Sequence, residues 1–242
     1  MTNFKPLKDY IAFLFDNANG KLNFKSPFLD AGTGIGDFSL ELSKRGFYGD
    51  ATDISEEPIK IAREILKGTN INIFNENATD IIGKYNLILA LDVIEHIKND
   101  KLFIKIMSKK LNKGGYIILT TPNNPSEWGW DDESYGHLRR YDQKDINLIL
   151  KNNGIEIILI WDLTFPIFWI MRRISLKIFK PKKLNLSVDE LTKISSLNPY
   201  WNRGYIGKFL NNLPLWKYFF HFQYLFRERG IGHEVFIVGK KI

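Results

Sequence analysis

The sequence of 242 residues contains no cysteine, which excludes disulfides, a thiolate metal site and a thiol nucleophile. It has no uncharged apolar run long enough to span a bilayer. The first residues, through Lys8, lack the apolar core of a secretory signal. Repeats and low-complexity tracts are absent as well. We therefore expect a folded, cytoplasmic protein.

Acidic residues are scarce in one part of the chain. The segment from Leu163 to Gly230 holds 12 of the 34 Lys and Arg residues but only 3 of the 27 Asp and Glu residues. The same segment holds 15 of the 34 aromatic residues. The formal net charge of +7 therefore comes from this segment, which needs an explanation of its own.

A glycine-rich turn follows the first apolar strand pattern. The run 27–29 leads into Asp30, Gly32, Gly34 and Gly36, and an amphipathic helical pattern begins at Phe38. This order indicates a strand, a tight turn and a helix, the opening of a nucleotide-binding α/β unit. Glycine permits positive φ and lets a ligand lie against bare backbone, while the helix N-terminus offers free N–H groups.

The spacing of the turn separates two kinds of cofactor. The dinucleotide-binding pattern G-x-G-x-x-G needs a third small residue at the position where this sequence has Asp37. The sequence has instead a carboxylate, Asp30, two residues before the first glycine. That carboxylate suits a ligand with a cationic group, not a pyrophosphate. An NAD-linked reductase is therefore the weakest candidate.

Strand and helix patterns alternate along the next 130 or so residues. After the strand at 28–31, further strands are expected at 47–52, 71–74, 85–90, 116–121 and 155–161, and helices at 7–15, 56–66, 98–111 and 142–153. Such alternation implies a parallel sheet with right-handed crossovers. The ligand is then expected over the carboxyl ends of the strands, at the switch between the first and fourth strands.

Taken together, these motifs resemble the class I S-adenosylmethionine (SAM) methyltransferases, and in particular the ubiquinone-biosynthesis O-methyltransferase type. The resemblance rests on Asp30–Gly36, Asp53, Tyr85–Ile97 and Leu111–Asn123 and covers about residues 25–161 plus the last strand. It implies SAM as cofactor and a Rossmann-like, doubly wound α/β sheet of seven strands. The last strand, 233–239, is expected to be antiparallel.

The expected domain organisation follows from this resemblance and from the basic segment. Residues 1–26 form a lead-in helix, and 27–162 form the SAM-binding methyltransferase core. Residues 163–230 form a helical insertion, where a minimal methyltransferase has a short turn. Residues 231–242 return to the core as its closing strand.

The resemblance also implies cofactor contacts. It places the amino-acid end of SAM at Asp30 and the glycine turn, the ribose hydroxyls at Asp53 and the adenine near Asn77. Asp53 has an alternative role as a helix N-cap, which Ser55 can perform instead. The family usually has an acidic residue where this sequence has Asn77, although an amide oxygen can accept the same hydrogen bond. Asp80 is the other candidate for the adenine contact. A polar turn without a cofactor contact is an equal alternative. The full expected set is Asp30, Gly32, Thr33, Gly34, Gly36, Asp53, Ile54, Asn77, Ala78 and Leu91.

Two histidines are the candidate catalytic residues, because an imidazole can remove a hydroxyl proton near neutral pH. His96 follows the fourth strand, and we favour a structural or orienting role for it because Glu-His recurs there in the resembling family. Asp92, Glu95 and His96 stand at i, i+3 and i+4. Quinone-pathway relatives use such a trio for a divalent ion. We predict no metal and keep this trio as the alternative.

His137 lies in the loop after the fifth strand, in the run Gly-His-Leu-Arg-Arg-Tyr. This run is similar to one in methyltransferases linked to cell-envelope glycans and lipids. We predict that His137 lies at the acceptor as a general base or positioning group, and that Arg139 or Arg140 pairs with a phosphate or carboxylate on it. Tyr141 and Trp128 complete the expected acceptor side. The alternative is a loop held by ion pairs to its own acidic residues, Asp131, Asp132 and Glu133.

The insertion 163–230 combines aromatic residues with cations. This composition fits a peripheral membrane element, or a lid over a lipid-like acceptor. A helical cap or a homodimer interface would have the same composition. Nucleic acid also binds cations and aromatic rings, but the aliphatic and Phe content exceeds that of a solvated stacking groove. The cations nearest its first apolar run are Arg172, Arg173, Lys177, Lys180, Lys182 and Lys183.

The sequence therefore predicts a SAM-dependent methyltransferase acting on the oxygen of a small-molecule acceptor, which is lipid-linked, isoprenoid or quinone-like, or of glycan type. Its expected place is the cytoplasm or the inner membrane face. An RNA methyltransferase is the first alternative because the pI is about 9.3, but no N-P-P-Y-like motif follows the fourth strand. The second alternative is a scaffold protein with this fold that catalyses nothing.

Overall fold

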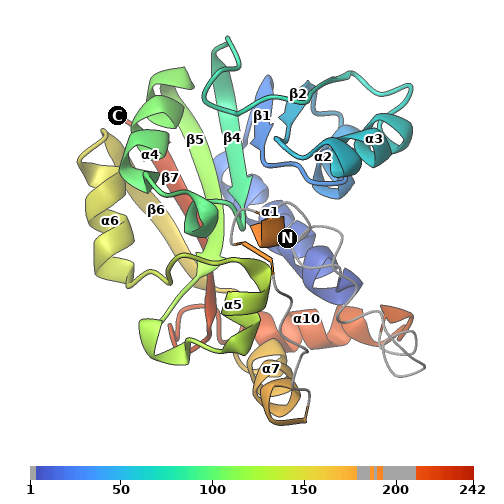
Figure 1. The fold of residues 1–242 in the computed structure, drawn as a ribbon, viewed down its shortest axis with the longest axis vertical. Coiled ribbons are helices and arrows are strands. Elements are labelled where there is room, and N and C mark those ends of the chain that lie inside the picture. Colours follow the sequence, from blue (N-terminus) through green and yellow to red (C-terminus); the bar gives the residue numbers. More distant parts are fainter. Residues whose placement is uncertain (1–3, 179–185, 188–189, 193–210) are drawn as a thin grey trace.

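The alternation of side chains in the central strand builds both faces of the sheet. In β4 (Tyr85–Leu91), Leu87 and Leu89 join one hydrophobic cluster, whereas Ile88 and Ala90 join the other. Successive side chains of a strand point to opposite faces, so a strand that is apolar throughout must be covered on both. Helices cover both faces of this sheet (Figure 1).

The computed structural model describes residues 4–178, 186–187, 190–192 and 211–242. Its seven-stranded sheet has the order β3-β2-β1-β4-β5-β7-β6. β1 pairs in parallel with β2 and β4, and β7 runs antiparallel between β5 and β6. The predicted fold class is confirmed. The remaining strands are β1 (Phe28–Ala31), β2 (Gly49–Thr52), β3 (Ile71–Phe74), β5 (Leu111–Pro122), β6 (Ile155–Asp162) and β7 (Glu234–Lys241).

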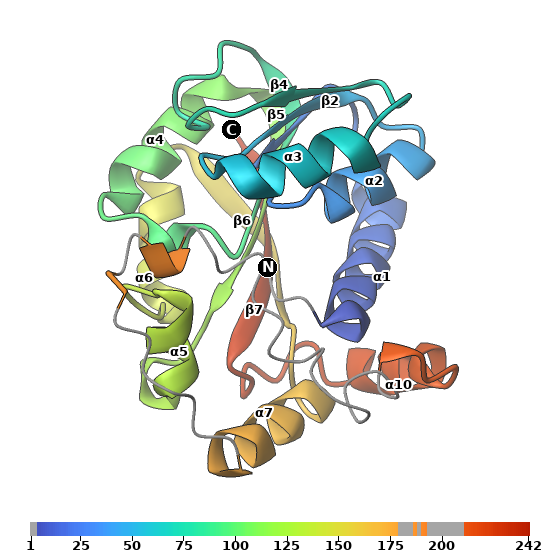
Figure 2. The same cartoon turned by 45° about the vertical axis from the view of Figure 1, so that its right-hand side comes forward.

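The helices divide between the two faces of the sheet (Figures 1 and 2). One face is covered by α1 (Lys5–Leu22), α2 (Asp37–Lys44) and α3 (Glu56–Ile65), and the other by α4 (Asp100–Lys110) and α6 (Gln143–Lys151). Short elements stand at the carboxyl ends of β4 and β5: η1 (Ile94–His96), η2 (Pro125–Glu127) and α5 (Trp130–Tyr135). The loops that follow β1 and β4 leave the sheet at its topological switch, where ligands of such folds bind.

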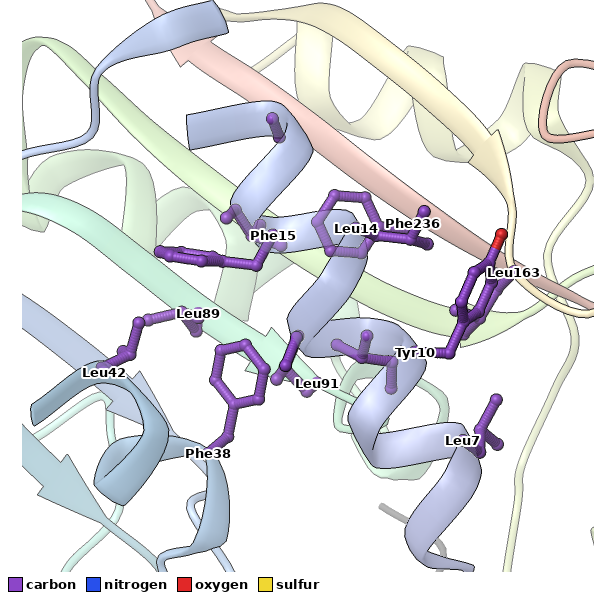
Figure 3. Packing of buried hydrophobic residues seen from close by; sticks show 14 of the residues in the cluster. Leu7, Tyr10, Leu14, Phe15, Phe38, Leu42, Leu89, Leu91, Leu163 and Phe236 are labelled. Carbon is purple, nitrogen blue, oxygen red and sulfur yellow. The ribbon is translucent and has the colours of Figure 1, made fainter. Parts of the chain in front are cut away.

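Helix α1 packs its apolar stripe on the sheet. Figure 3 shows Leu7, Tyr10, Leu14 and Phe15 of this helix among strand residues that include Leu91. The helix is longer than the predicted range 7–15. It begins at Lys5, one residue before a proline in its first turn, and ends at Leu22, after which Asn23 adopts the left-handed conformation. Beyond Phe15, Ala18 and Leu22 extend the apolar stripe at helical spacing and pack on the same hydrophobic cluster.

The segment 163–230, predicted to be an insertion, includes helices α7 (Ile167–Ile178) and α10 (Trp216–Tyr224). Aromatic rings join them to α1: Phe4 lies edge-on to Phe168 and to Trp216, with ring centroids 6.0 and 5.9 Å apart. No described helix is both long and apolar enough to cross a membrane. Of the cations singled out in the sequence, Lys180, Lys182 and Lys183 lie outside the described residues.

Candidate active site

The turn after β1 exposes bare backbone to a cavity. Gly32 and Gly34 both adopt positive φ, and a Cβ on Gly32 would lie 2.6 Å from Cγ2 of Val93. A side chain at Gly32 would therefore clash as well as strain the backbone. Asp53, at the end of β2, accepts hydrogen bonds from the N–H of Gly34 at 2.9 Å and of Ser55 at 2.8 Å. One carboxylate thus fixes the turn from across the cavity.

The carboxyl group of Asp30 is buried at the end of β1. Its Oδ2 accepts hydrogen bonds from the hydroxyls of Thr33 at 2.7 Å and Ser39 at 2.6 Å. Burial raises the pKa of Asp30, and these two hydrogen bonds oppose the rise. A cationic group of a ligand beside this carboxyl would favour its charged form.

Every expected cofactor residue except Gly36 lines the same cavity. Gly36 serves packing instead, because a Cβ there would lie 3.1 Å from Cβ of Ala62 in α3. The cavity offers carboxylates at Asp30 and Asp53, which suit the ammonium group and the ribose hydroxyls of SAM, and bare backbone between them. The Oδ1 atom of Asn77 already accepts hydrogen bonds from the N–H and the hydroxyl of Thr79. The donors and acceptors present fit SAM.

A second cavity adjoins the first, and Asp92 and His96 line both. Its walls come from the loop after β5, the start of β7, and helices α1 and α7, so residues far apart in the sequence meet there. The lining combines apolar side chains with acids, histidines and arginines. The lining residues include Phe4, Leu7, Glu95, Pro122, Trp130, Asp131, Tyr135, His137, Arg140, Phe168, Met171, Arg172, Leu176, His233 and Glu234.

His137 is oriented by a buried carboxylate in this second cavity. Its Nδ1 lies 2.8 Å from Oδ1 of Asp132. Because a carboxylate only accepts, Nδ1 carries the proton and Nε2 keeps a lone pair. Burial would raise the pKa of Asp132, but hydrogen bonds from His137 and the charge of Arg140 bring it below its ordinary value. Asp132 is therefore an anion able to stabilise a positively charged His137.

His96 lies beside His137, with ring centroids 4.9 Å apart. Its Nδ1 is 3.2 Å from the carbonyl oxygen of Gly136. Burial, and then the charge of His137, lower the pKa of His96 to about 3. A histidine with so low a pKa stays neutral at physiological pH and is a weak base, an environment that suits the orienting role predicted for it.

Three polar atoms in the second cavity have no hydrogen-bond partner among the described residues: Glu95 Oε1, His233 Nδ1 and Glu234 Oε2. Burial, and then the charge of Asp92, raise the pKa of Glu95, and they raise the pKa of Glu234 to about 8. Burial, and then three arginines, lower the pKa of His233. Unsatisfied buried groups of this kind can receive the polar head of a ligand.

The raised pKa of Glu234 makes stability depend on pH. Its protonated form is favoured in the fold, so this contribution is complete below about pH 4.5 and is lost as the pH rises to about 8. We expect Glu234→Gln, which stays neutral, to unfold at a higher temperature than the wild type above about pH 8, with the difference shrinking toward pH 4.5. Thermal unfolding across this range is the measurement.

The matched control for Glu234→Gln is Glu228→Gln, because that glutamate side chain is 72% exposed. It should unfold like the wild type at every pH. A difference between Glu234→Gln and the wild type that is constant with pH would contradict the assignment of the titration to Glu234.

Glu95, His96 and His137 could hold a metal ion, since their ligand atoms lie within 4.8 Å of one another. This set is not the trio considered from the sequence, which had Asp92 in place of His137. The Oδ1 atom of Asp92 instead accepts a hydrogen bond from the hydroxyl of Thr120 at 2.6 Å. The raised pKa of Glu95 favours its neutral form, which is not a cation ligand. The absence of a resident metal stays a prediction.

Of the four residues expected on the acceptor side, Arg140 lines the second cavity. Its guanidinium contacts Asp132 and the carbonyl oxygens of Asn123 and His233, so it is internally paired. Arg139 pairs with Asp100, and the Tyr141 hydroxyl donates to the same carboxylate at 2.8 Å. The Trp128 side chain is exposed. Only the Arg140–Asp132 pair lies within the acidic run that the sequence analysis named as the alternative, because Arg139 pairs outside that run.

The family follows from a profile described as "Methyltransferase domain", which matches residues 2–160. The chain belongs to this methyltransferase family. It is 28% identical over 139 residues to the ubiquinone biosynthesis O-methyltransferase of Erwinia tasmaniensis, a match that covers 52% of this chain and 55% of that protein. The chain thus spans about half the length of the curated relatives it matches. The predicted family and its cofactor, SAM, are confirmed.

Solved methyltransferase structures share the fold. A putative sarcosine dimethylglycine methyltransferase from Galdieria sulphuraria is similar over 97% of this chain and 86% of its own, with a TM-score of 0.62 and 15% identity. Magnesium protoporphyrin IX methyltransferase from Synechocystis PCC 6803, solved with bound S-adenosylhomocysteine, covers 64% of this chain and 73% of its own, with a TM-score of 0.52 and 22% identity. At these identities the likeness shows the fold.

Sequence reasoning missed the residues that the start of β7 and helix α7 bring to the second cavity. His233 and Glu234 were assigned only to the closing strand, and Arg172 only to a basic segment. The sequence did contain a signal that could have placed His233 and Glu234. The strand β7 runs antiparallel to both of its neighbours, so its start lies at the carboxyl ends of β5 and β6. A polar pair at that start therefore lies at the edge of the sheet where ligands bind.

Proposed function

We propose that the chain transfers a methyl group from SAM to an oxygen of a lipid-like small molecule. The observation that supports this most is the junction of the two cavities at Asp92 and His96. Bound SAM supplies an electrophilic methyl group on its sulfonium. The chain then has to align the acceptor and take its proton. His137 Nε2 accepts the proton of the acceptor hydroxyl, and Asp132 stabilises the imidazolium that forms.

The second cavity suits an acceptor with an apolar body and a small polar head. Phe4, Phe168 and Met171 contribute apolar surface, while His233 and Glu234 offer unsatisfied polar atoms. An acceptor with hydroxyls on an aromatic or isoprenoid body would match both the apolar and the polar side chains of this lining. The relatives named for ubiquinone biosynthesis support an isoprenoid or quinone-like acceptor over a glycan. This acceptor class is part of the proposal.

We also propose that the insertion contacts a membrane surface. On α7, Ile170, Ile174 and Ile178 are exposed at one face, and cations on the same helix lie beside them. On α10 and its ends, Leu215, Tyr218, Phe219, Phe222 and Leu225 are exposed. Apolar stripes flanked by cations are typical of helices that lie in the interface of anionic bilayers. Such a surface would deliver a lipid-like acceptor directly to the second cavity.

The test is transfer of label from [methyl-³H]SAM to fractions of a cell extract. We expect label in the organic-solvent fraction, and none when His137→Ala replaces the wild type. Label in RNA, lost at high salt, would establish the RNA methyltransferase instead. SAM binding without label in any fraction would establish the scaffold alternative.

Liposome flotation tests the membrane part. The wild type should float with anionic vesicles, and Ile174→Glu with Ile178→Glu should stay in solution because charges replace the exposed apolar stripe. Leu148→Glu, on α6 across the sheet, is the control, since that leucine is also exposed. A wild type that stays in solution at low salt would leave the insertion as a cap or a dimer contact.

A further inference from the structure

Helix α4 carries three lysines that have no acidic partner among the described residues. Lys101, Lys105 and Lys109 are exposed and stand four residues apart, so they form one stripe along the helix. None of them forms an ion pair within the part of the chain that the structure describes. The one acid of the helix, Asp100, is buried and pairs with Arg139. We call the three residues the lysine stripe.

Exposed lysines on the helices that cover the opposite face of the sheet are paired within their own helices. The pairs are Lys5–Asp9 in α1, Lys44–Glu41 in α2 and Lys60–Glu56 in α3. Like charges four residues apart destabilise a helix, and a cation in the first turn opposes the helix dipole. Lys101 lies in the first turn of α4. The lysine stripe therefore works against the stability of α4, and folding alone does not explain it.

Exposed aliphatic side chains accompany the lysine stripe. Leu102, on the same helix, is 48% exposed. Ile82, in the loop before β4, is 97% exposed. That loop is fastened to the end of α4, because Lys84 donates a hydrogen bond to the carbonyl oxygen of Lys109 at 2.7 Å. Exposed apolar side chains rimmed by charge are a mark of a surface where another macromolecule docks.

We propose that the lysine stripe docks an acidic amphipathic helix of a partner protein. Successive lysines of the stripe are about 6 Å apart along the helix axis, which is also the spacing of carboxylates at every fourth position of a second helix lying alongside. Aliphatic side chains of that second helix would cover Leu102 and Ile82. Complementary charges of this kind speed association and fix the orientation of the partner.

Two other anionic partners fit this surface less well. Single-stranded RNA is bound by aromatic stacking as well as by phosphate contacts, but the one aromatic residue of α4, Phe103, is buried, and α6 beside it has none. A bilayer that meets α7 and α10 would not reach α4 at the same time, because both views show α4 well apart from those helices (Figures 1 and 2). The stripe lysines line neither cavity, so a docked partner leaves the cofactor and acceptor cavities open.

Fluorescence anisotropy with synthetic peptides tests the docking site. The acidic probe is a helical peptide with glutamates at every fourth position and leucines beside them, and the basic probe has lysines in place of the glutamates. The wild type should bind the acidic probe at low salt and not the basic probe. The stripe variant, Lys101→Glu with Lys105→Glu and Lys109→Glu, should bind the acidic probe about 10-fold more weakly or worse. The same variant should gain binding of the basic probe.

The matched control reverses three exposed lysines elsewhere, Lys5→Glu with Lys44→Glu and Lys60→Glu, and so changes the net charge equally. It should bind the acidic probe within a few-fold of the wild type. Ile82→Ser should weaken binding of the acidic probe and leave that of poly(U) RNA unchanged, because the serine removes only an aliphatic contact. The stripe variant should unfold at the wild-type temperature and keep the wild-type affinity for S-adenosylhomocysteine, because its lysines are exposed and line neither cavity.

Three results would overturn the inference. The first is a wild type that does not bind the acidic probe at low salt. The second is an equal loss of acidic-probe binding in the stripe variant and in the matched control, which would mean a general effect of net charge. The third is binding of poly(U) RNA or of anionic vesicles that depends on the lysine stripe and is tighter than binding of the acidic probe, which would assign the surface to nucleic acid or to a membrane.

Discussion

Replacing Asp53 by alanine is expected to weaken the binding of S-adenosylhomocysteine by about 100-fold or more. The proposed role of this carboxylate is to accept hydrogen bonds from both ribose hydroxyls, and charge-assisted bonds of this kind are the strong ones. The same carboxylate also accepts the N–H of Gly34 and so fixes the glycine turn. Alanine removes both contributions at once. Calorimetric titration of the purified variant measures the effect.

Two further variants make the Asp53 result interpretable. Asp53→Asn keeps oxygen as an acceptor but loses the charge, so its affinity should fall between those of alanine and the wild type. Glu56→Ala, three residues later, removes a carboxylate that is exposed and paired with Lys60, and it should bind as the wild type does. Affinity within a few-fold of the wild type in Asp53→Ala, with thermal unfolding unchanged, would remove Asp53 from the ribose site.

The cofactor half of the site could be predicted because its signals are local. The glycines, Asp30 and Asp53 each lie within a few residues of a strand end, and the order of strands fixes where those ends meet. A pattern of spacing therefore translates directly into a position. Gly36 is an exception to this rule. It belongs to the motif by its spacing, but it packs against Ala62 of α3, and spacing alone does not reveal a packing partner.

The acceptor half could not be predicted in the same way, because its contacts join distant segments. Arg172 of α7 makes a two-point contact with Asp131, with distances of 2.6 and 2.8 Å. The sequence analysis offered the acidic residues of this loop as partners for the arginines of the same loop. One of them, Asp132, also accepts a hydrogen bond from Arg172, which lies 40 residues further along the chain. Which cation meets which acid depends on how the insertion packs, and composition alone does not fix packing.

This buried ion-paired network has a consequence for the acceptor cavity. Arg172 is 5% exposed and its partners are three acidic side chains of η2 and α5. Breaking one member would leave the others buried without compensation. The loop that carries His137 is therefore held by the insertion, so the position of the candidate base depends on α7 as well as on the core. A rigid support of this kind is what positioning a proton acceptor requires.

His137→Ala is expected to lower turnover by about 10²- to 10⁴-fold, the range for loss of a general base. The ring has Nδ1 fixed by Asp132 and Nε2 left to accept a proton, while its neighbour His96 is too weak a base to replace it, with a pKa of about 3. The cofactor cavity does not include His137 among its lining residues. The affinity for S-adenosylhomocysteine should therefore stay as in the wild type.

Asp132→Asn tests how Asp132 orients His137, and thermal unfolding is measured beside turnover because Asp132 also pairs with Arg140 and Arg172. The amide can present its N–H to Nδ1 and select the tautomer that places the proton on Nε2, so turnover should fall although His137 is still present. Glu133→Gln serves as the matched control, because Glu133 is an exposed carboxylate on the same helix and does not line the second cavity. Unchanged turnover in His137→Ala would assign the proton to another group, and Glu234, on the same cavity, would then be the residue to replace.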